Sequence, residues 1–324
     1  MLITDKKLLK LVEKKAKQLE YGMTPKELYQ PIKYIMSLGG KRLRPLLAIK
    51  SYSLFKDDVE SIIKQAMAVE VFHNFTLMHD DIMDEAPLRR GKPTVHEKYN
   101  ANTAILSGDV MMVKAYEMLM QPHECDAEIF TKFSTCATEV CEGQQLDMVF
   151  ETKKTVVVEE YINMIRLKTA VLLGFCLELG GILAETTEKN KKALRAFGEN
   201  IGIGFQLKDD LLDVYGDQAK FGKQVGGDII SNKKTFLLIT ALNTAKGKQK
   251  TALNEWLNNQ AAKPAEKVKA ITAIYDELGI KETTEQKMNE YFEKAFQSLK
   301  KVDAPFIRRG KLKSFADSII KREK

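Results

Sequence analysis

The chain has 324 residues, of which 44% are hydrophobic and 29% charged, as expected for a soluble globular protein that buries a sizeable core. Its formal net charge is +7 and its isoelectric point is about 8.9. The lysines and arginines are scattered and often alternate with glutamate, without the basic, aromatic-interleaved stripe of a nucleic-acid-binding protein, so a small anionic substrate explains the positive charge at least as well.

Helical periodicity extends over the whole chain, and strand alternation is almost absent. It predicts a single all-α domain over residues 1–324, a large bundle of long helices. The predicted helices span residues 5–20, 25–37, 43–55, 59–83, 101–120, 126–150, 157–183, 188–216, 233–245, 249–258, 264–279, 283–300 and 311–323.

The cysteines and the apolar stretches indicate the compartment. The four cysteines have neither CxxC spacing nor the density of a disulfide framework, which favours a reducing, cytoplasmic location. The N-terminus leads into an amphipathic helix and not into a signal peptide. The most apolar stretch, 170–183, is too short to span a bilayer and contains Glu178, so no stable membrane insertion is expected.

One acidic pattern occurs twice, as DDIMD at 80–84 and as DDLLD at 209–213. On a helix, positions i, i+1 and i+4 lie within about 100° of arc, so each pattern places three carboxylates on one side. Such carboxylates repel one another unless a cation lies among them, and hard oxygen ligands favour Mg²⁺. Because Mg²⁺ usually takes one or two carboxylates together with phosphate oxygens, the pair of patterns predicts a diphosphate held between two helices.

A solvated surface is the ordinary explanation for one acidic cluster. Both clusters, however, interrupt strongly apolar stretches, 66–78 and 201–207, that are typical of buried helices. Repetition in the same setting therefore favours a functional site.

Basic residues surround the first cluster. Residues 39–45, GGKRLRP, place cations and backbone N–H groups where a loop enters a helix, which suits an anion. Residues 89–94, RRGKPT, follow the cluster directly, and guanidinium groups bind phosphate oxygens in a bidentate manner.

With these segments the sequence resembles the trans-type polyprenyl diphosphate synthases, which add isopentenyl diphosphate head-to-tail to an allylic diphosphate. The resemblance covers nearly the whole chain. It implies a short-chain synthase that makes farnesyl or geranylgeranyl diphosphate. The matching segments are GGKRLRP (39–45), His73, DDIMD (80–84), RRGKPT (89–94), GQQLD (143–147), Lys168-Thr169, FQLKDDLLD (205–213) and GKQVGGDIISNKKT (222–235).

The resemblance implies an isoprenoid synthase-like fold, a homodimer, and three Mg²⁺ ions per site with substrate bound. It implies metal ligation by Asp80, Asp84, Asp147, Asp209, Asp210 and Asp213, with a less direct contribution from Asp81. It further implies that Arg89, Lys168, Lys223 and Lys233 bind the allylic diphosphate. Lys41, Arg44, His73 and Arg90 would bind isopentenyl diphosphate.

The chemistry explains such an arrangement. Loss of diphosphate leaves an allylic carbocation, so the leaving group needs a dense positive clamp and the cation needs a closed apolar cavity with a few oriented dipoles. The resemblance assigns those dipoles to Gln206 and to the backbone carbonyls of Lys168 and Thr169. The departing diphosphate is a sufficient proton acceptor, so no protein base is expected.

Residues shortly before Asp80 are expected to limit product length, because the growing chain extends along that helix. Phe75 and Phe72 are bulky and Thr76 is small, a combination that resembles short-chain synthases and leaves farnesyl and geranylgeranyl products open. Ordinary core packing is the alternative for both phenylalanines.

Two other functions remain open from the residues. An HD-type metal phosphohydrolase would use His73 with His79 and Asp80, but it leaves the second acidic cluster unexplained. A non-catalytic structural subunit of a prenyl synthase would be expected to lose metal ligands, and both clusters are intact. The roles of Arg308, Arg309 and Arg322 near the C-terminus are not assigned.

Overall fold

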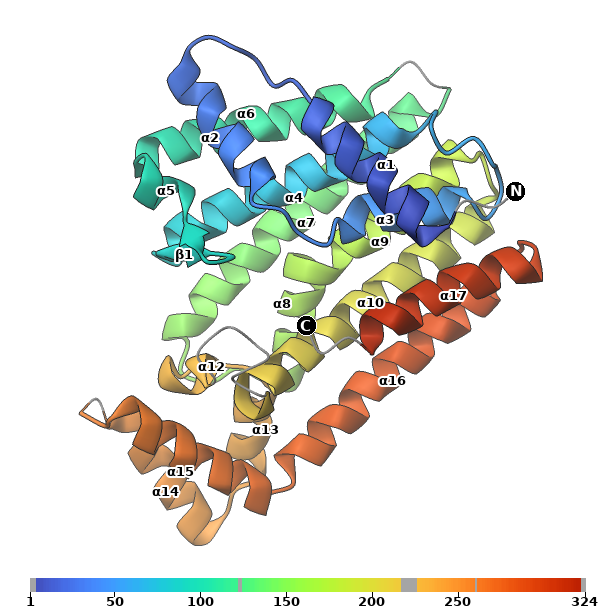
Figure 1. Ribbon diagram of the computed structural model, residues 1–324. Coiled ribbons are helices and arrows are strands. Elements are labelled where there is room, and N and C mark those ends of the chain that lie inside the picture. The colour runs from blue at the N-terminus through green and yellow to red at the C-terminus, as the bar shows by residue number, and fades with distance from the viewer. Residues whose placement is uncertain (1–3, 122–123, 217–225, 260, 322–324) are drawn as a thin grey trace. The chain divides into compact units, whose positions relative to one another are not determined.

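The computed structural model describes residues 4–121, 124–216, 226–259 and 261–321 (Figure 1). Apart from one short hairpin, the regular structure of these residues is helical, which confirms the predicted all-α class. The elements of the first half are α1 (Asp5–Gln18), α2 (Lys26–Ser37), α3 (Leu43–Tyr52), α4 (Ile63–Met83), β1 (Leu88–Arg89), β2 (Lys92–Pro93), α5 (Val95–Lys98), α6 (Ala101–Leu119), α7 (Asp126–Thr152) and α8 (Val158–Ile165).

The helices of the second half follow the predicted order. They are the π-helical turn η1 (Arg166–Ala170), α9 (Val171–Leu183), α10 (Glu188–Tyr215), α12 (Gly227–Ile230), α13 (Phe236–Thr244), α14 (Gly247–Asn258), α15 (Pro264–Glu277), α16 (Ile280–Lys300) and α17 (Phe306–Ile320). α8, η1 and α9 together form the helix predicted at 157–183.

The chain forms two compact units. The first contains residues 1–135, 175–195 and 302–309, and the second contains 136–174, 196–301 and 310–324. Each unit has its own buried side chains and its own group of predicted site residues.

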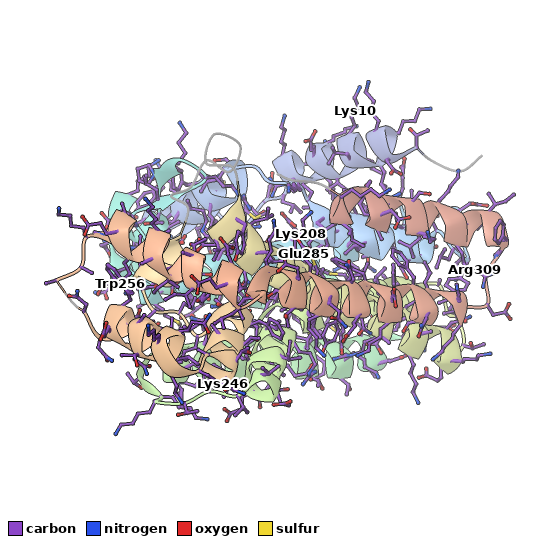
Figure 2. All side chains as sticks on the ribbon, turned by 90° about the horizontal axis from the view of Figure 1, so that it is seen from below. Lys10, Lys208, Lys246, Trp256, Glu285 and Arg309 are labelled. Atoms are coloured by element: carbon purple, nitrogen blue, oxygen red, sulfur yellow. The ribbon has the colours of Figure 1, made fainter. Side chains whose placement is uncertain are left out.

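The first unit is organised around α4, which packs along α6 and also contacts α1, α2 and α3 (Figure 1). Every position of α4 from Gln65 to Val71 is buried. Close packing against α6 depends on Gly108, because a Cβ atom there would lie 2.3 Å from Nε2 of His79. α1 buries Leu8 and Val12, whereas lysines such as Lys10 point outward into solvent (Figure 2).

The second unit contains two apolar clusters. One joins the end of α10 to α12, α13, α14 and α15, with Leu237 and Leu253 fully buried. The other joins α7, α8 and α13 to the middle of α10, with Tyr161 and Leu207 buried. The second cluster lies beside the residues predicted to carry out the chemistry in this unit.

In the described residues, no helix is long and apolar enough to cross a membrane.

Candidate active site

The first aspartate cluster lies at the C-terminal end of α4, where the buried helix reaches the surface. Asp80 is partly exposed, and Asp84 is exposed in the C-cap position. Asp81 is only 2% exposed. A helix C-terminus already carries partial negative charge, so carboxylates gathered there need a compensating cation.

Arg89 supplies part of that compensation. Its Nε lies 2.7 Å from Oδ2 of Asp81, and its Nη2 lies 2.6 Å from Oδ1, which makes a bidentate ion pair. Asp81 therefore holds Arg89 in place.

A β-hairpin carries Arg89 and Arg90. β1 and β2 pair antiparallel, with Arg89 opposite Lys92, and Arg90 and Gly91 form the turn with φ of 54° and 73°. Positive φ at both turn residues is the type I′ pattern that suits tight hairpins. The turn directs Arg90 to the loop before α3, where its guanidinium group donates a hydrogen bond to the Gly39 carbonyl.

That loop needs its two glycines. Gly39 has φ of 82° and Gly40 has φ of 134°, and a Cβ atom on Gly40 would lie 3.0 Å from two guanidinium nitrogens of Arg90. The motif thus brings Lys41, Arg44 and Arg90 into one part of the first unit.

The pKa of His73 is affected by the positive charges of this basic cluster. The side chain is largely buried on α4, and this burial together with the guanidinium groups of Arg44, Arg90, Arg89 and Arg42 holds the pKa of His73 well below its ordinary value. A neutral imidazole among several fixed cations is a favourable place for a multiply charged anion.

Arg42 and Glu70 form a buried ion pair that the sequence analysis did not predict. Arg42 Nη1 lies 2.8 Å from Glu70 Oε1, and Arg42 Nη2 donates to the Met36 carbonyl at 2.8 Å. Asn74 Nδ2 donates to the Glu70 carbonyl at 2.8 Å. The pair anchors the basic loop to α4, and the sequence signal for it was a lone glutamate inside an apolar run.

The predicted chain-length residues lie in an aromatic cluster of the first unit. Phe72 is fully buried and Phe75 is 7% exposed, with ring centroids 5.4 Å apart. Phe133 packs edge-on against Phe72 at 5.0 Å. Thr76 is partly exposed, and its hydroxyl donates to the His73 carbonyl at 2.8 Å.

The second cluster distributes its carboxylates along α10. Asp209 is exposed, Asp213 is partly exposed, and Asp210 is 4% exposed. Asp213 Oδ2 accepts the N–H of Asp228 at 2.9 Å, which fixes the start of α12. Gly226, at φ of 84°, also donates its N–H to the Asp213 carbonyl, at 2.6 Å.

Asp210 is enclosed by protein donors. Tyr161 donates its hydroxyl to Asp210 Oδ2, and Gln206 Nε2 lies 3.2 Å from Oδ1. Burial raises the pKa of Asp210 to about 7, while the hydrogen bonds from Tyr161 and Gln206 oppose that rise. These contacts favour a supporting role for Asp210 over direct metal ligation.

The π-turn η1 carries Lys168 and Thr169. In it the N–H of Val171 donates to the Arg166 carbonyl, five residues back. Single π-turns within helices often mark functional sites. Gly143 of the GQQLD segment lies directly against the turn, since a Cβ atom there would lie 2.2 Å from the backbone nitrogen of Lys168.

Two lysines converge on Asp147. Lys168 Nζ lies 2.6 Å and Lys233 Nζ 3.8 Å from Asp147 Oδ2. Burial raises the pKa of Asp147, but the two lysines outweigh it and the net shift is downward. The carboxylate is therefore ionised, which is the form that can bind a metal ion.

The remaining sequence-based candidates have simpler surroundings. Lys223 and Arg322 lie outside the described residues. Arg308 contacts the Ser53 carbonyl and Asp57, both at 3.0 Å, so it anchors the start of α17. His79 bonds the Ile105 carbonyl at 3.1 Å, which explains this histidine by packing and not by metal ligation.

The accessible carboxylates fit the expected Mg²⁺. Asp80, Asp84 and Asp209 present hard, charged oxygen donors at least partly open to solvent. Within the described part of the chain, no three His, Cys, Asp or Glu side chains are grouped so that they could hold a metal ion. Mg²⁺ generally completes its coordination with water and phosphate oxygens.

Comparison with known proteins agrees with this chemistry. A short-chain isoprenyl diphosphate synthase of Methanocaldococcus jannaschii is 41% identical over 276 residues, which cover 85% of this chain and 84% of the relative. A geranylgeranyl pyrophosphate synthetase structure from Pyrococcus horikoshii has a TM-score of 0.89 at 34% identity, with 98% of this chain and 96% of that chain covered.

A third protein was crystallised with ligands. The geranylgeranyl pyrophosphate synthase of Corynebacterium glutamicum, complexed with isoprenyl diphosphate and magnesium, has a TM-score of 0.85 at 30% identity. The superposition covers 97% of this chain and 98% of the Corynebacterium chain. The sequence profile described as polyprenyl synthetase matches residues 25–275. The chain therefore belongs to the polyprenyl synthetase family of prenyltransferases.

Proposed function

We propose that this chain is a Mg²⁺-dependent synthase that condenses isopentenyl diphosphate with dimethylallyl, geranyl or farnesyl diphosphate. The observation that carries the proposal is the pair of aspartate clusters, each at the point where a buried helix becomes accessible and each accompanied by basic side chains. The head-to-tail reaction releases diphosphate and gives a farnesyl or geranylgeranyl product.

Each unit contributes one group of residues to the proposed reaction. In the first unit, Lys41, Arg44, His73 and Arg90 bind the diphosphate of isopentenyl diphosphate, and Asp80 and Asp84 provide metal ligands. In the second unit, Asp209 provides a further ligand, with Asp147 beside the same ions. Lys168, Lys233 and Lys223 bind the allylic diphosphate together with Arg89.

Magnesium, when bound, neutralises charge that develops on the departing diphosphate. Three ions per site is our expectation for the substrate-bound enzyme. The magnesium present in the Corynebacterium structure supports the choice of metal. The protein's own contribution is to hold the leaving group in a positive clamp and to keep water away from the allylic cation.

The cation is stabilised by oriented dipoles in the second unit. Gln206 and the backbone carbonyls of Lys168 and Thr169 present oxygen atoms to it. After carbon–carbon bond formation, the released diphosphate accepts the proton that the new product loses. No protein base is needed, and the lowered pKa of His73 leaves that residue neutral, as a hydrogen-bond partner for phosphate.

We also propose a cytoplasmic homodimer. The four cysteines have neither CxxC spacing nor the density of a disulfide framework, which suits a reducing compartment. On α6, Leu106 and Val113 are 59% and 53% exposed and lie two helical turns apart on one side. An apolar stripe of this kind is suited to burial against a second copy.

The other two functions have less support. The packing of His79 against Gly108 accounts for it without a metal, which removes the reason for an HD-type phosphohydrolase. The retained carboxylates and lysines are unexpected in a non-catalytic subunit.

The test is incubation with labelled isopentenyl diphosphate and each allylic starter in turn, followed by chromatography of the dephosphorylated products. We expect extension to fifteen or twenty carbons that depends on Mg²⁺. Hydrolysis without extension would instead indicate a phosphohydrolase, and no reaction with any starter would indicate a structural subunit.

A further inference from the structure

Four side chains of the second unit form a continuous chain of hydrogen bonds. Thr169 Oγ1 donates to Gln206 Oε1 at 3.3 Å, and Gln206 Nε2 donates to Asp210 Oδ1 at 3.2 Å. The hydroxyl of Tyr161 donates to the other carboxylate oxygen of Asp210. The chain thus joins α8, η1 and α10 through polar contacts.

Exposure changes along this chain. Tyr161 is 1% and Asp210 4% exposed, whereas Gln206 and Thr169 are partly exposed. Tyr161 also packs in the apolar cluster with Met164 and Leu207, so its ring has little freedom to move. A fixed, buried end therefore supports an accessible end.

The chemistry of the partners decides which way the Gln206 amide faces. Asp210 Oδ1 accepts a hydrogen bond from Gln206 Nε2, so the NH₂ end of the amide faces Asp210. The carbonyl oxygen then points to Thr169 and keeps a second lone pair for another positive group. Gln206 and Asp210 are four residues apart on α10, the spacing at which helical side chains meet.

We propose that Tyr161 and Asp210 are positioning residues that fix the Gln206 amide with its oxygen toward the developing allylic cation. The inference rests on the proposed function, in which Gln206 faces that cation. Tyr161 matters because it holds Asp210 at the oxygen that Gln206 does not use. Without this support the amide is free to turn its NH₂ group, the positive end of its dipole, toward the cation.

The test is Tyr161→Phe, which removes one hydroxyl and keeps the ring. With isopentenyl and geranyl diphosphates, kcat should fall on the order of tenfold or more, as expected when a catalytic dipole loses its orientation. KM for both substrates and the Mg²⁺ concentration for half-maximal activity should stay unchanged, because no diphosphate or metal contact is altered.

A double-mutant cycle with Gln206→Leu separates positioning from general damage. If Tyr161 acts through Gln206, adding Tyr161→Phe to Gln206→Leu causes no further loss of kcat. An equal loss in both backgrounds, or a raised KM with kcat unchanged, would overturn the inference. Thr169→Val, which removes the donor at the other end of the chain, should reproduce the fall in kcat even if Tyr161→Phe folds poorly.

Tyr215→Phe is the matched control. The Tyr215 hydroxyl donates to Asp276 at 3.0 Å, so this change also removes a tyrosine–aspartate hydrogen bond from the second unit. Its kcat should equal that of the wild type. Wild-type protein that is inactive with every starter would sink the proposed function itself, whereas active wild type with an unaffected Tyr161→Phe variant would sink only the positioning role.

Discussion

At the scale of single residues, the two aspartate clusters share one division of labour. The second aspartate of each, Asp81 or Asp210, is 2% or 4% exposed and is held by a protein donor. Successive helical residues are about 100° apart, whereas i and i+4 differ by only about 40°. When the aspartate at the first position of the motif faces outward, the aspartate at the second position therefore faces inward. The aspartate at the fifth position is again on the accessible side.

Product length should depend on Phe75. Phe75→Ala removes a ring from the aromatic cluster on α4. We expect longer products, because the space proposed to hold the growing chain becomes deeper. Mass spectrometry of dephosphorylated products measures the change. The control is Phe306→Ala, which makes the same substitution at a ring that is 81% exposed and should leave the products unaltered. An unchanged product distribution in Phe75→Ala would show that Phe75 does not limit the depth of that space.

The neutral His73 predicts a pH dependence of stability. The pKa of His73 in the folded protein lies well below the ordinary 6.5. As the pH falls, the imidazole is therefore protonated in the unfolded chain before it is protonated in the folded protein. The contribution of neutral His73 to the unfolding free energy is therefore fully present above pH 6.5 and declines as the pH falls below it. Between pH 7.5 and 5.5, wild type should lose about 1 kcal/mol more than His73→Gln in urea denaturation. Equal losses would show that His73 is not desolvated as described.

The residue roles were only partly predictable from sequence. The accessible members Asp80, Asp84 and Asp209 stand in motifs whose spacing identifies them. The buried supports Glu70 and Tyr161 lie in apolar helices, where nothing in the local pattern distinguishes a hydrogen-bonded polar side chain from an ordinary core residue. Finding them requires knowing which helices pack together.

At the scale of elements, the π-turn η1 and the glycine that packs against it belong together. η1 interrupts a helix whose periodicity otherwise predicts an unbroken rod from 157 to 183, and Gly143 of α7 lies against its backbone. The sequence contains the glycine but gives no sign of the extra residue in the turn, because π-helical and α-helical stretches have nearly the same apolar pattern.

Gly143→Ala tests this contact. The new Cβ would lie 2.2 Å from Lys168 N and 2.6 Å from Leu167 C, both backbone atoms, so α7 or the π-turn must shift. We expect a loss of about 2 kcal/mol or more in unfolding free energy, typical of overpacking, and a large fall in kcat.

Gly310→Ala is the control for that substitution. Gly310 lies inside α17 with nothing within 4 Å of the added Cβ atom, so alanine should stabilise by about 0.5–1 kcal/mol through helix propensity. Chemical denaturation of both variants measures the contrast. A Gly143→Ala protein as stable and active as wild type would contradict the close packing.

Short elements escaped the sequence analysis. The long helices begin and end within a few residues of prediction, except that α17 starts at Phe306 instead of 311. α5, α12 and the β1–β2 hairpin were not predicted, because four-residue helices and two-residue strands are too short to show periodicity. The hairpin follows from the positive φ of Arg90 and Gly91, a backbone property that the Arg-Gly pair alone does not specify.

At the scale of the whole molecule, we expect residues 1–324 to act as a single domain. The chain passes between its two compact units at five points, and four of them fall inside α7, α9, α10 and α17, whereas domain boundaries normally fall in exposed linkers. Unfolding in urea should accordingly be one transition by both fluorescence and circular dichroism. Two separated transitions would contradict a single domain.

The proposed homodimer is also tested on the whole molecule. Light scattering should give twice the mass of one 36.7 kDa chain. Leu106→Lys with Val113→Lys places charges on the exposed stripe of α6 and should shift the protein toward monomer, whereas Lys10→Glu on the exposed side of α1 should not. A monomeric wild type would remove the proposed interface.

The central claim is that both aspartate clusters bind one diphosphate through shared divalent ions. A crystal structure with Mg²⁺ and an unreactive allylic thiodiphosphate tests it most directly. We predict carboxylate oxygens of Asp80 and Asp209 at about 2.0–2.1 Å from ions that also contact the same diphosphate. A diphosphate held by one cluster alone, with the other cluster turned to bulk solvent, would contradict the account.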